Sequence, residues 1–273
     1  MDSYKNCDEN MSIEEFDKYK RFYKDLPEEL KDFANKVRMI QMKSKRSWKK
    51  NNTNWIVKHK LNQDDDDKLV SNFKCILNKI GDNNFKEISQ ELLSLDIDTP
   101  DHLEKLADMI FNKAVKEDKY YTVYVKLCDL LYNKYVQDDD ENKTYFRVIL
   151  LNKCQETFVE ALDTDCEDEL KDIGLKNKLD LIGLVKLISG LYNNSLITNS
   201  IIYDCLFALT VKVNDNKWYA IDCLCTMMNC VMKQFETNCP DNYRQLIDFL
   251  LDLTKDKKIK SKDRFAIMDV LGL

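Results

Sequence analysis

Glycine and proline are scarce along this chain: its 273 residues include five glycines and three prolines. Doubly wound α/β folds and all-β folds need many turn glycines, so this scarcity favours a helical protein. The N-terminus has no charged segment followed by an apolar one, and no run of about eighteen apolar residues occurs. From these features we expect a cytoplasmic chain that is neither secreted nor inserted in a membrane.

From Lys68 onward, apolar residues recur at the spacing of three and four that is typical of amphipathic helices. About ten such segments follow one another, joined in pairs with a period of roughly 40 residues. Gly81 stands where a glycine would end the first helix, and Thr99 before Pro100 has the order of a helix start. The pattern predicts an all-α fold, an α-solenoid of about five HEAT-like antiparallel helix pairs. A globular helical bundle would show the same periodicity and is the alternative.

The composition divides the chain into three parts. Residues 1–45 form a partly helical N-terminal extension, residues 46–67 a basic and then acidic linker, and residues 68–273 the repeat domain. The linker ends in the acidic run Asp64–Asp67, and a second acidic run occupies Asp138–Glu141. We expect both runs to be solvated segments between helices, and the linker itself not to be helical.

Ten cysteines are present, and most of them stand among apolar residues. A cysteine in an apolar helical stretch behaves as a small hydrophobic residue. Six have this setting: Cys75, Cys128, Cys154, Cys205, Cys223 and Cys230. Cys223 and Cys225 form a C-x-C pair, but there is no C-x-x-C and there are only two histidines. We expect reduced, buried thiols, and neither a metal nor a cofactor.

No motif of enzymatic chemistry occurs in the sequence. The phosphate-binding patterns G-x-x-x-x-G-K and G-x-G-x-x-G are absent, as are the nucleophile motif G-x-S-x-G and the zinc motif H-E-x-x-H. The carboxylates fall on polar faces and in predicted loops. We therefore expect a protein that binds other macromolecules and is not an enzyme.

Five segments carry a specific resemblance. They are FKCILNKIGDNNF at residues 73–85, I-D-T at 97–99 with IFNKA at 110–114, FRVILLNKCQETF at 146–158, LITNSIIYDC at 196–205, and C-L-C at 223–225 with R-F at 264–265 and D-V-L at 269–271. Together they resemble the middle domain of eukaryotic translation initiation factor 4 gamma, the scaffold of the cap-binding complex. The third segment is the most specific, since it is similar to the family pattern F-R-x-L-L-L-N-R-C-Q-x-x-F. The matches are in order and cover about residues 46–273.

The resemblance implies a scaffold of five HEAT-like hairpins that acts in translation initiation. Such a domain binds and activates the DEAD-box RNA helicase of the cap-binding complex, and it contacts RNA weakly. Some members also contact initiation factor 3 or the ribosome, and a monomer is expected. The alternatives are an adaptor of the same fold in mRNA decay or splicing, and a competitor that sequesters the helicase without activating it.

The resemblance also indicates which residues contact the helicase. Trp48 stands where the family has a tryptophan upstream of the first repeat, although it could equally pack the linker onto the repeats. The candidate contacts within the repeats match the family's L-N-K and L-N-R-C-Q runs: Leu77, Asn78, Lys79, Asn152, Lys153 and Gln155. We expect Leu77 to belong partly to the core and the polar residues to make the contacts.

A basic stretch with interleaved aromatic residues precedes the repeats. Its cations are Lys43, Lys45, Arg46, Lys49 and Lys50, with Trp48 and Trp55 among and after them. Cations can neutralise phosphates and aromatic rings can stack on bases, so this stretch predicts a weak, salt-sensitive RNA contact. The same cations could instead face acidic residues of the helicase or simply solvate a linker.

Overall fold

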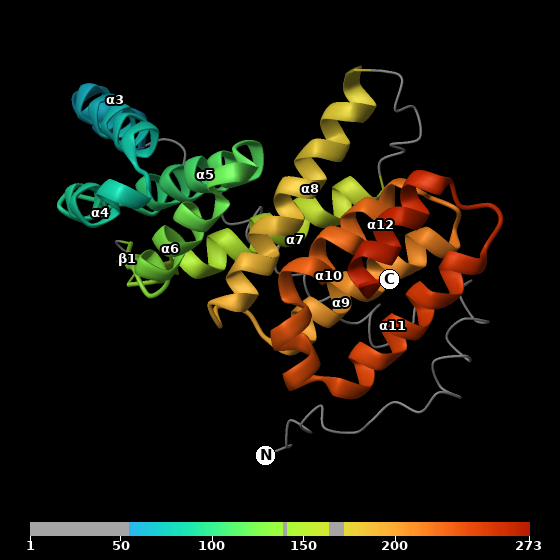
Figure 1. The fold of residues 1–273 in the computed structure, drawn as a ribbon. Coiled ribbons are helices and arrows are strands. Elements are labelled where there is room, and N and C mark those ends of the chain that lie inside the picture. The colour runs from blue at the N-terminus through green and yellow to red at the C-terminus, as the bar shows by residue number, and fades with distance from the viewer. Residues whose placement is uncertain (1–54, 139–140, 164–171) are drawn as a thin grey trace, which may run out of the picture. The chain divides into compact units, whose positions relative to one another are not determined.

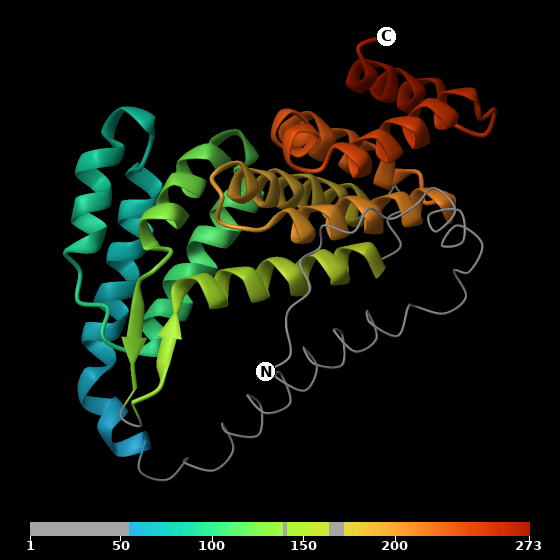
Figure 2. The ribbon, with the colours of Figure 1, turned by 90° about the horizontal axis from the view of Figure 1, so that it is seen from below.

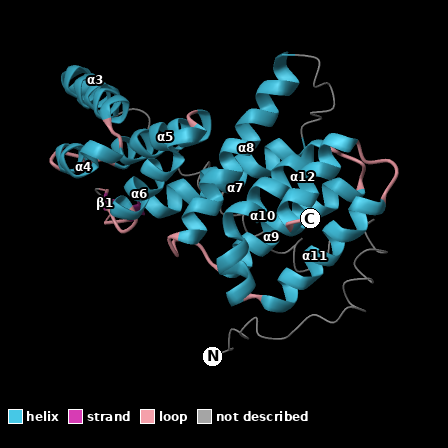
Figure 3. Cartoon of the chain, viewed as in Figure 1, coloured by secondary structure: helices cyan, strands magenta, loops and turns pink. Residues whose placement is uncertain are grey.

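The computed structural model describes residues 55–138, 141–163 and 172–273. The chain divides into two compact units, residues 1–68 and 69–273, and nearly all described residues belong to the second unit. Figures 1 and 3 show the described part as a succession of helices with one small pair of strands. The α-helices are α3 (Trp55–Lys79), α4 (Phe85–Leu93), α5 (Pro100–Lys116), α6 (Tyr121–Leu131), α7 (Phe146–Asp163), α8 (Asp172–Asn193), α9 (Asn199–Asn214), α10 (Tyr219–Asn238), α11 (Pro240–Lys255) and α12 (Ser261–Leu271).

Within the second unit the helices pack as pairs that stack on one another. Each helix from α5 to α12 packs against its partner in the pairs α5–α6, α7–α8, α9–α10 and α11–α12. Between pairs, α6 packs on α8, α8 on α10, and α10 on α12, while α5 packs on α7. Stacked second helices are what a HEAT-like repeat requires, because each pair buries its apolar face against its neighbours. The predicted all-α solenoid is confirmed.

Two glycines let α8 approach its neighbours closely. A Cβ added to Gly183 would lie 2.0 Å from the main-chain oxygen of Val115 at the end of α5. A Cβ added to Gly190, two turns further along α8, would lie 2.6 Å from a methyl carbon of Val125 on α6. Neither approach tolerates a side chain, so these glycines set the distance between the second and third pairs.

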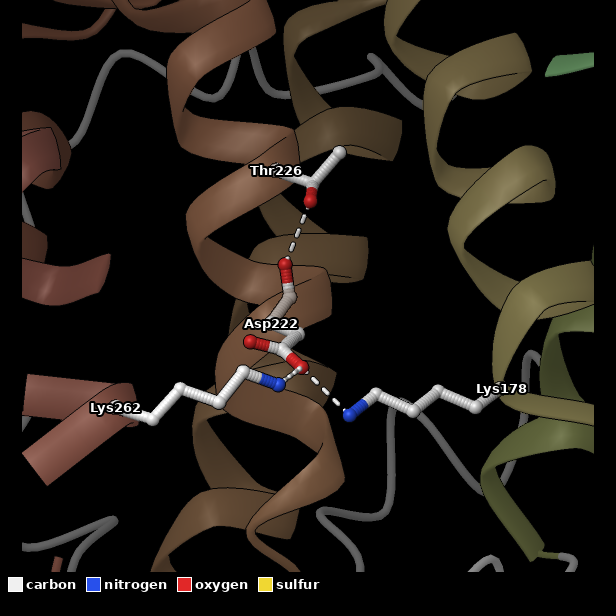
Figure 4. Close-up of polar contacts among 4 residues, drawn as sticks. All are labelled: Lys178, Asp222, Thr226 and Lys262. Atoms are coloured by element: carbon white, nitrogen blue, oxygen red, sulfur yellow. Dashed lines mark hydrogen bonds and ion pairs between the residues drawn. The ribbon is translucent and has the colours of Figure 1, made fainter. Parts of the chain in front are cut away.

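A polar cluster ties α8, α10 and α12 together (Figure 4). The Lys178 ammonium lies 2.6 Å from an Asp222 carboxylate oxygen, and the Lys262 ammonium lies 3.4 Å from the same oxygen. Burial alone would raise the pKa of Asp222, but the hydrogen bond and charge of Lys178 hold it below its usual value. Burial raises the pKa of neighbouring Asp263, which is 7% exposed. Asp222 is therefore the carboxylate through which two helices are held to α10.

The expectation that the linker at residues 46–67 is not helical is wrong for residues 55–67. Helix α3 begins at Trp55 and includes the whole acidic run from Asp64 to Asp67. No glycine or proline interrupts the sequence between Trp55 and Lys79, and Asp64 stands four residues before Lys68, a spacing that supports helices. Composition suggested a linker, but nothing in the backbone requires the helix to stop there.

A short β-hairpin between α6 and α7 has no counterpart in the predicted elements. Strands β1 (Tyr135–Gln137) and β2 (Lys143–Tyr145) pair antiparallel, with Tyr135 opposite Tyr145 (Figure 2). Their rings lie 5.3 Å apart, and Val136 between them is 6% exposed. The second acidic run falls at the turn of this hairpin, where the main-chain N–H of Asn142 donates to the Asp138 carboxylate. The described ends of that run, Asp138 and Glu141, lie in the connection between the two strands and not in a helix.

The prediction of buried thiols holds for three of the six cysteines, while Cys205 and Cys230 are half-buried and one is exposed. Cys128, Cys154 and Cys223 are buried, and burial raises the pKa of the Cys128 thiol to about 12. Cys75 is exposed, because Phe73, Ile76 and Leu77 turn the other side of α3 toward the core. In the described part of the chain, no helix combines the length and apolar character needed to cross a bilayer.

Candidate functional site

The last turn of α3 positions the first group of predicted contact residues. Leu77 is 2% exposed and packs in the core, whereas Asn78 and Lys79 are exposed. Consecutive helical residues are about 100° apart, so a buried Leu77 directs the two following side chains toward solvent. The Asn84 side chain closes this helix end by accepting from the Gly81 N–H at 2.7 Å and donating to the Lys79 carbonyl at 2.9 Å. Leu77 is therefore an anchor, and the polar pair is what a partner can reach.

The end of α3 and the middle of α5 border a shallow depression of about 250 Å³. Its lining combines apolar side chains with amide and ammonium groups: Lys74, Leu77 and Asn78 from α3, and Met109, Asn112 and Lys113 from α5. We call it the α3–α5 depression. Its cations and amides suit a partner that presents carboxylates or carbonyl oxygens.

The α5 side of this depression is held in place by a carboxylate. The Lys113 ammonium lies 2.5 Å from one oxygen of Glu117, and the Tyr124 hydroxyl donates to the other at 2.9 Å. Burial would raise the pKa of Glu117, but the hydrogen bonds from Lys113 and Tyr124 bring it below its usual value. Glu117 thus stays ionised at neutral pH and fixes the position of the Lys113 ammonium.

The second group of predicted residues lies on α7 and also reaches α5. The Lys153 ammonium lies 3.1 Å from the Asp108 carboxylate of α5. One turn further along α5, the Asn112 side chain donates to the Asp108 main-chain oxygen at 2.7 Å. Asn152 is exposed and Gln155 is half-buried. The structure therefore brings both predicted groups against one helix, α5, whose residues sequence reasoning had not assigned to the site.

Helix α7 also exposes two apolar residues that sequence reasoning missed. Val148 is 49% exposed and Val159 is 51% exposed. With Asn152 and Gln155 they follow the spacing of a single helical face, and an exposed apolar pair beside polar candidates is typical of a binding surface. We call the α3–α5 depression together with this face of α7 the α3–α5–α7 surface. A signal for its middle part was present in the sequence, since Asn112 and Lys113 belong to the I-F-N-K-A segment.

Two sets of predicted residues lie outside the described part of the chain. They are Trp48 and the cations Lys43, Lys45, Arg46, Lys49 and Lys50. Their roles in helicase and RNA binding stay predictions.

Comparison with known families bears directly on this surface. The family model described as the MIF4G domain matches residues 72–273, which include every residue of the α3–α5–α7 surface. The chain belongs to the MIF4G domain family. The segments of this MIF4G domain that resembled the middle domain of initiation factor 4 gamma lie entirely within the matched range.

Curated relatives agree with this assignment. This MIF4G domain is 27% identical over 230 residues to human eukaryotic translation initiation factor 4 gamma 3, a match that covers 75% of this chain and 14% of the human protein. It is 25% identical over 226 residues to rice (Oryza sativa subsp. japonica) eukaryotic translation initiation factor 4G, covering 77% and 13%. The chain therefore spans about a seventh of the length of the curated relatives it matches.

A solved structure supports the fold. The crystal structure of the MIF4G domain of Trypanosoma cruzi translation initiation factor EIF4G5 matches with a TM-score of 0.50 and 18% identity. The match covers 75% of this chain and 94% of that chain. At this identity the comparison concerns the fold alone.

Proposed function

We propose that this MIF4G domain is a translation-initiation scaffold that binds and activates a DEAD-box RNA helicase and contacts RNA. The observation that carries the proposal is that each family-like polar group has a residue against α5: Asn78 lines the α3–α5 depression, and the Lys153 ammonium pairs with Asp108. A surface of exposed amides and cations with two valines at its α7 side suits a protein partner with acidic and apolar groups.

The proposed activity is a shift of an equilibrium. A scaffold that catalyses nothing can raise a helicase's ATPase rate only if it binds the productive arrangement of the enzyme more tightly than the unproductive one. The α3–α5–α7 surface would supply that difference if the helicase contacts the α3–α5 depression and the α7 face together. The N-terminal basic stretch would add the weak RNA contact.

The test is the RNA-stimulated ATPase of a eukaryotic cap-complex helicase with and without the full chain. We expect a several-fold rise with the wild type, and loss of that rise in the variant Asn78→Asp/Lys79→Glu. Its matched control is Asn229→Asp/Lys233→Glu on α10, where both residues are also exposed and the charge change is the same. Circular dichroism would establish that both variants keep the helical fold.

The outcomes separate the candidate functions. Binding without a rise in ATPase rate would indicate a competitor that sequesters the helicase. Absence of binding by a folded wild-type chain would contradict the helicase proposal and favour the adaptor role in mRNA decay or splicing. An equal loss in the α10 control would show that net charge, and not the α3–α5–α7 surface, determines the effect.

A further inference from the structure

The turn between α11 and α12 is strongly cationic in a chain whose formal net charge is −6. Residues 255–264 hold six cations and two carboxylates. Five of the cations are exposed lysines: Lys255, Lys257, Lys258, Lys260 and Lys262. We call residues 255–262 the α11–α12 basic loop.

Three of these lysines make no ion pair with a carboxylate among the described residues, although the charge of Lys260 acts on the Asp263 carboxylate. Lys255 pairs with Asp252 at 3.2 Å, and Lys262 reaches Asp222 at 3.4 Å. In contrast, Lys257, Lys258 and Lys260 make no ion pair within the ranges that the structure describes. Their charges are therefore available to an anionic partner.

The loop holds these lysines in a fixed arrangement. Ile259 is 4% exposed and anchors the loop in the core between Lys258 and Lys260. The Arg264 guanidinium donates to the Asp256 carbonyl at 2.9 Å and to the Ile259 carbonyl at 3.3 Å. The Asp256 carboxylate accepts from the main-chain N–H of Lys258 at 2.8 Å. Asp256 and Arg264 thus fix the backbone of the loop. Because the loop is already ordered, little conformational entropy is lost when a partner binds.

An exposed aromatic ring stands beside the loop. Phe265 on α12 is 64% exposed. It lies three residues after Lys262 and four after Ser261, a spacing that places all three on neighbouring parts of the helix surface. Asp263, between them in sequence, is 7% exposed and turned inward. A solvent-facing ring on the helix that directly follows a cationic loop is a combination that single-stranded nucleic acids use, with phosphates on the cations and a base on the ring.

We propose that the α11–α12 basic loop and Phe265 form a contact for single-stranded RNA, separate from the N-terminal stretch at residues 43–50. Lys257, Lys258 and Lys260 neutralise successive phosphates, and the ring of Phe265 stacks on a base. An acidic protein partner fits less well because the exposed α12 positions one turn to either side of Phe265 are Ser261 and Asp269, which leaves a single ring and no apolar patch. A single ring is sufficient to stack on one base.

The test measures RNA binding in a chain from which the N-terminal contact has been removed. The background variant carries Gln at Lys43, Lys45, Arg46, Lys49 and Lys50. Fluorescence anisotropy with a labelled twenty-nucleotide oligouridine, at several salt concentrations, gives the affinity and its salt dependence. The loop variant adds Lys257→Glu/Lys258→Glu/Lys260→Glu, and the matched control adds Lys86→Glu/Lys119→Glu/Lys233→Glu at exposed lysines elsewhere.

We expect the loop variant to bind at least tenfold more weakly than the background, and the control to bind nearly as tightly. The slope of log affinity against log salt should become shallower by about 2, since each single-strand phosphate contact contributes about 0.7. Phe265→Ala should weaken binding several-fold with the slope unchanged, because a stacked ring releases no counterion.

Three results would overturn the proposal. Equal weakening in the loop and control variants would show a non-specific charge effect. No loss in the loop variant would show that the RNA binding that remains without the N-terminal cations lies elsewhere in the chain. Equally tight binding of polyaspartate, insensitive to Phe265→Ala, would identify an acidic-protein surface. None of these results depends on the helicase, so the helicase proposal is tested separately.

Discussion

Helices α4 and α10 are both the second helix of a pair, yet they are buried to very different extents. Of the 20 residues of α10, ten are buried, whereas three of the nine residues of α4 are. Helix α10 packs against α8, α9, α11 and α12, whereas no α-helix packs to a comparable extent against α4 in the part of the chain that the structure describes. In stacked repeats each helix gains stability from its neighbours, so the first pair is expected to open at a lower free energy than the fourth.

The helices that differ in burial also lie near different features of the molecule. The α3 side of the α3–α5 depression belongs to the first pair, whereas the Lys178–Asp222–Lys262 cluster joins the third, fourth and fifth pairs. Binding surfaces are often found in the less stable parts of a protein, where adjustment to a partner costs little. Hydrogen exchange should therefore show earlier exchange in α4 than in α10.

The largest expected effect on stability comes from truncating a buried side chain to alanine in each of the two helices. Phe235→Ala removes a ring that is 0% exposed on α10 and should lower the free energy of unfolding by about 4 kcal/mol. Ile88→Ala on α4, where the side chain is 8% exposed, should cost about 2 kcal/mol. Urea denaturation followed by circular dichroism measures both. Equal costs would show that the two pairs are equally well packed.

A second prediction concerns the approach of α8 to α5. Gly183→Ala places a Cβ against the Val115 main-chain oxygen, which cannot rotate away, and should cost about 3 kcal/mol. The control is Gly81→Ala near the first pair, where the nearest atom, an Asn84 side-chain oxygen, lies 3.7 Å from the added Cβ. That change should alter the unfolding midpoint in urea little. A well-tolerated Gly183→Ala would contradict the close packing of the second and third pairs.

A third prediction uses pH to test the ion pairs that Lys178 and Lys262 form with Asp222 on α10. The pKa of Asp222 is below its unfolded value, so its ion pairs stabilise the fold above the unfolded pKa, and that stabilisation disappears as the pH falls through the folded pKa. Asp222→Asn should lower the free energy of unfolding by about 2 kcal/mol at pH 7, less than for a fully buried pair. Below about pH 4 the difference from wild type should shrink.

Thermal melts at pH 7 and pH 3 provide the measurement for this pair. The control is Asp252→Asn, because its ion pair with Lys255 is about 70% exposed on both sides and contributes little. If the melting temperatures of Asp222→Asn and wild type differed by the same amount at both pH values, the contribution of Asp222 to stability would not come from its ion pairs.

The last variant, Lys153→Ala, should change stability the least of those considered, yet it should strongly reduce helicase activation. Lys153→Ala removes an ion pair with Asp108 whose side chains are 39% and 50% exposed, so the stability cost should stay below about 1 kcal/mol. We expect the same variant to lose most of the helicase activation, since Lys153 is one of the candidate helicase contacts and its ammonium lies against α5. Parallel melts and ATPase assays would detect this separation. Unchanged activation would remove Lys153 from the proposed contact.

The number and pairing of the helices could be predicted because local signals agree with the packing. Thr99 shows this at one boundary: it precedes Pro100, and its side chain accepts a hydrogen bond from the His102 N–H at 3.2 Å. Apolar spacing likewise identified the buried faces, as Leu150 and Phe158 on α7 show. The exception, Cys75, was assigned by its apolar neighbours and not by its angular position on α3.

The sequence by itself determined the all-α class, the five pairs, the family and the polar residues at the ends of the L-N-K runs. Tertiary structure alone decided that α5 lies between those groups, that Gly183 touches the main chain of α5, and that a β-hairpin joins α6 to α7. The reason is physical. Periodicity reports which side of a helix is buried, but the helix that covers that side is chosen by shape and contact between segments far apart in the chain.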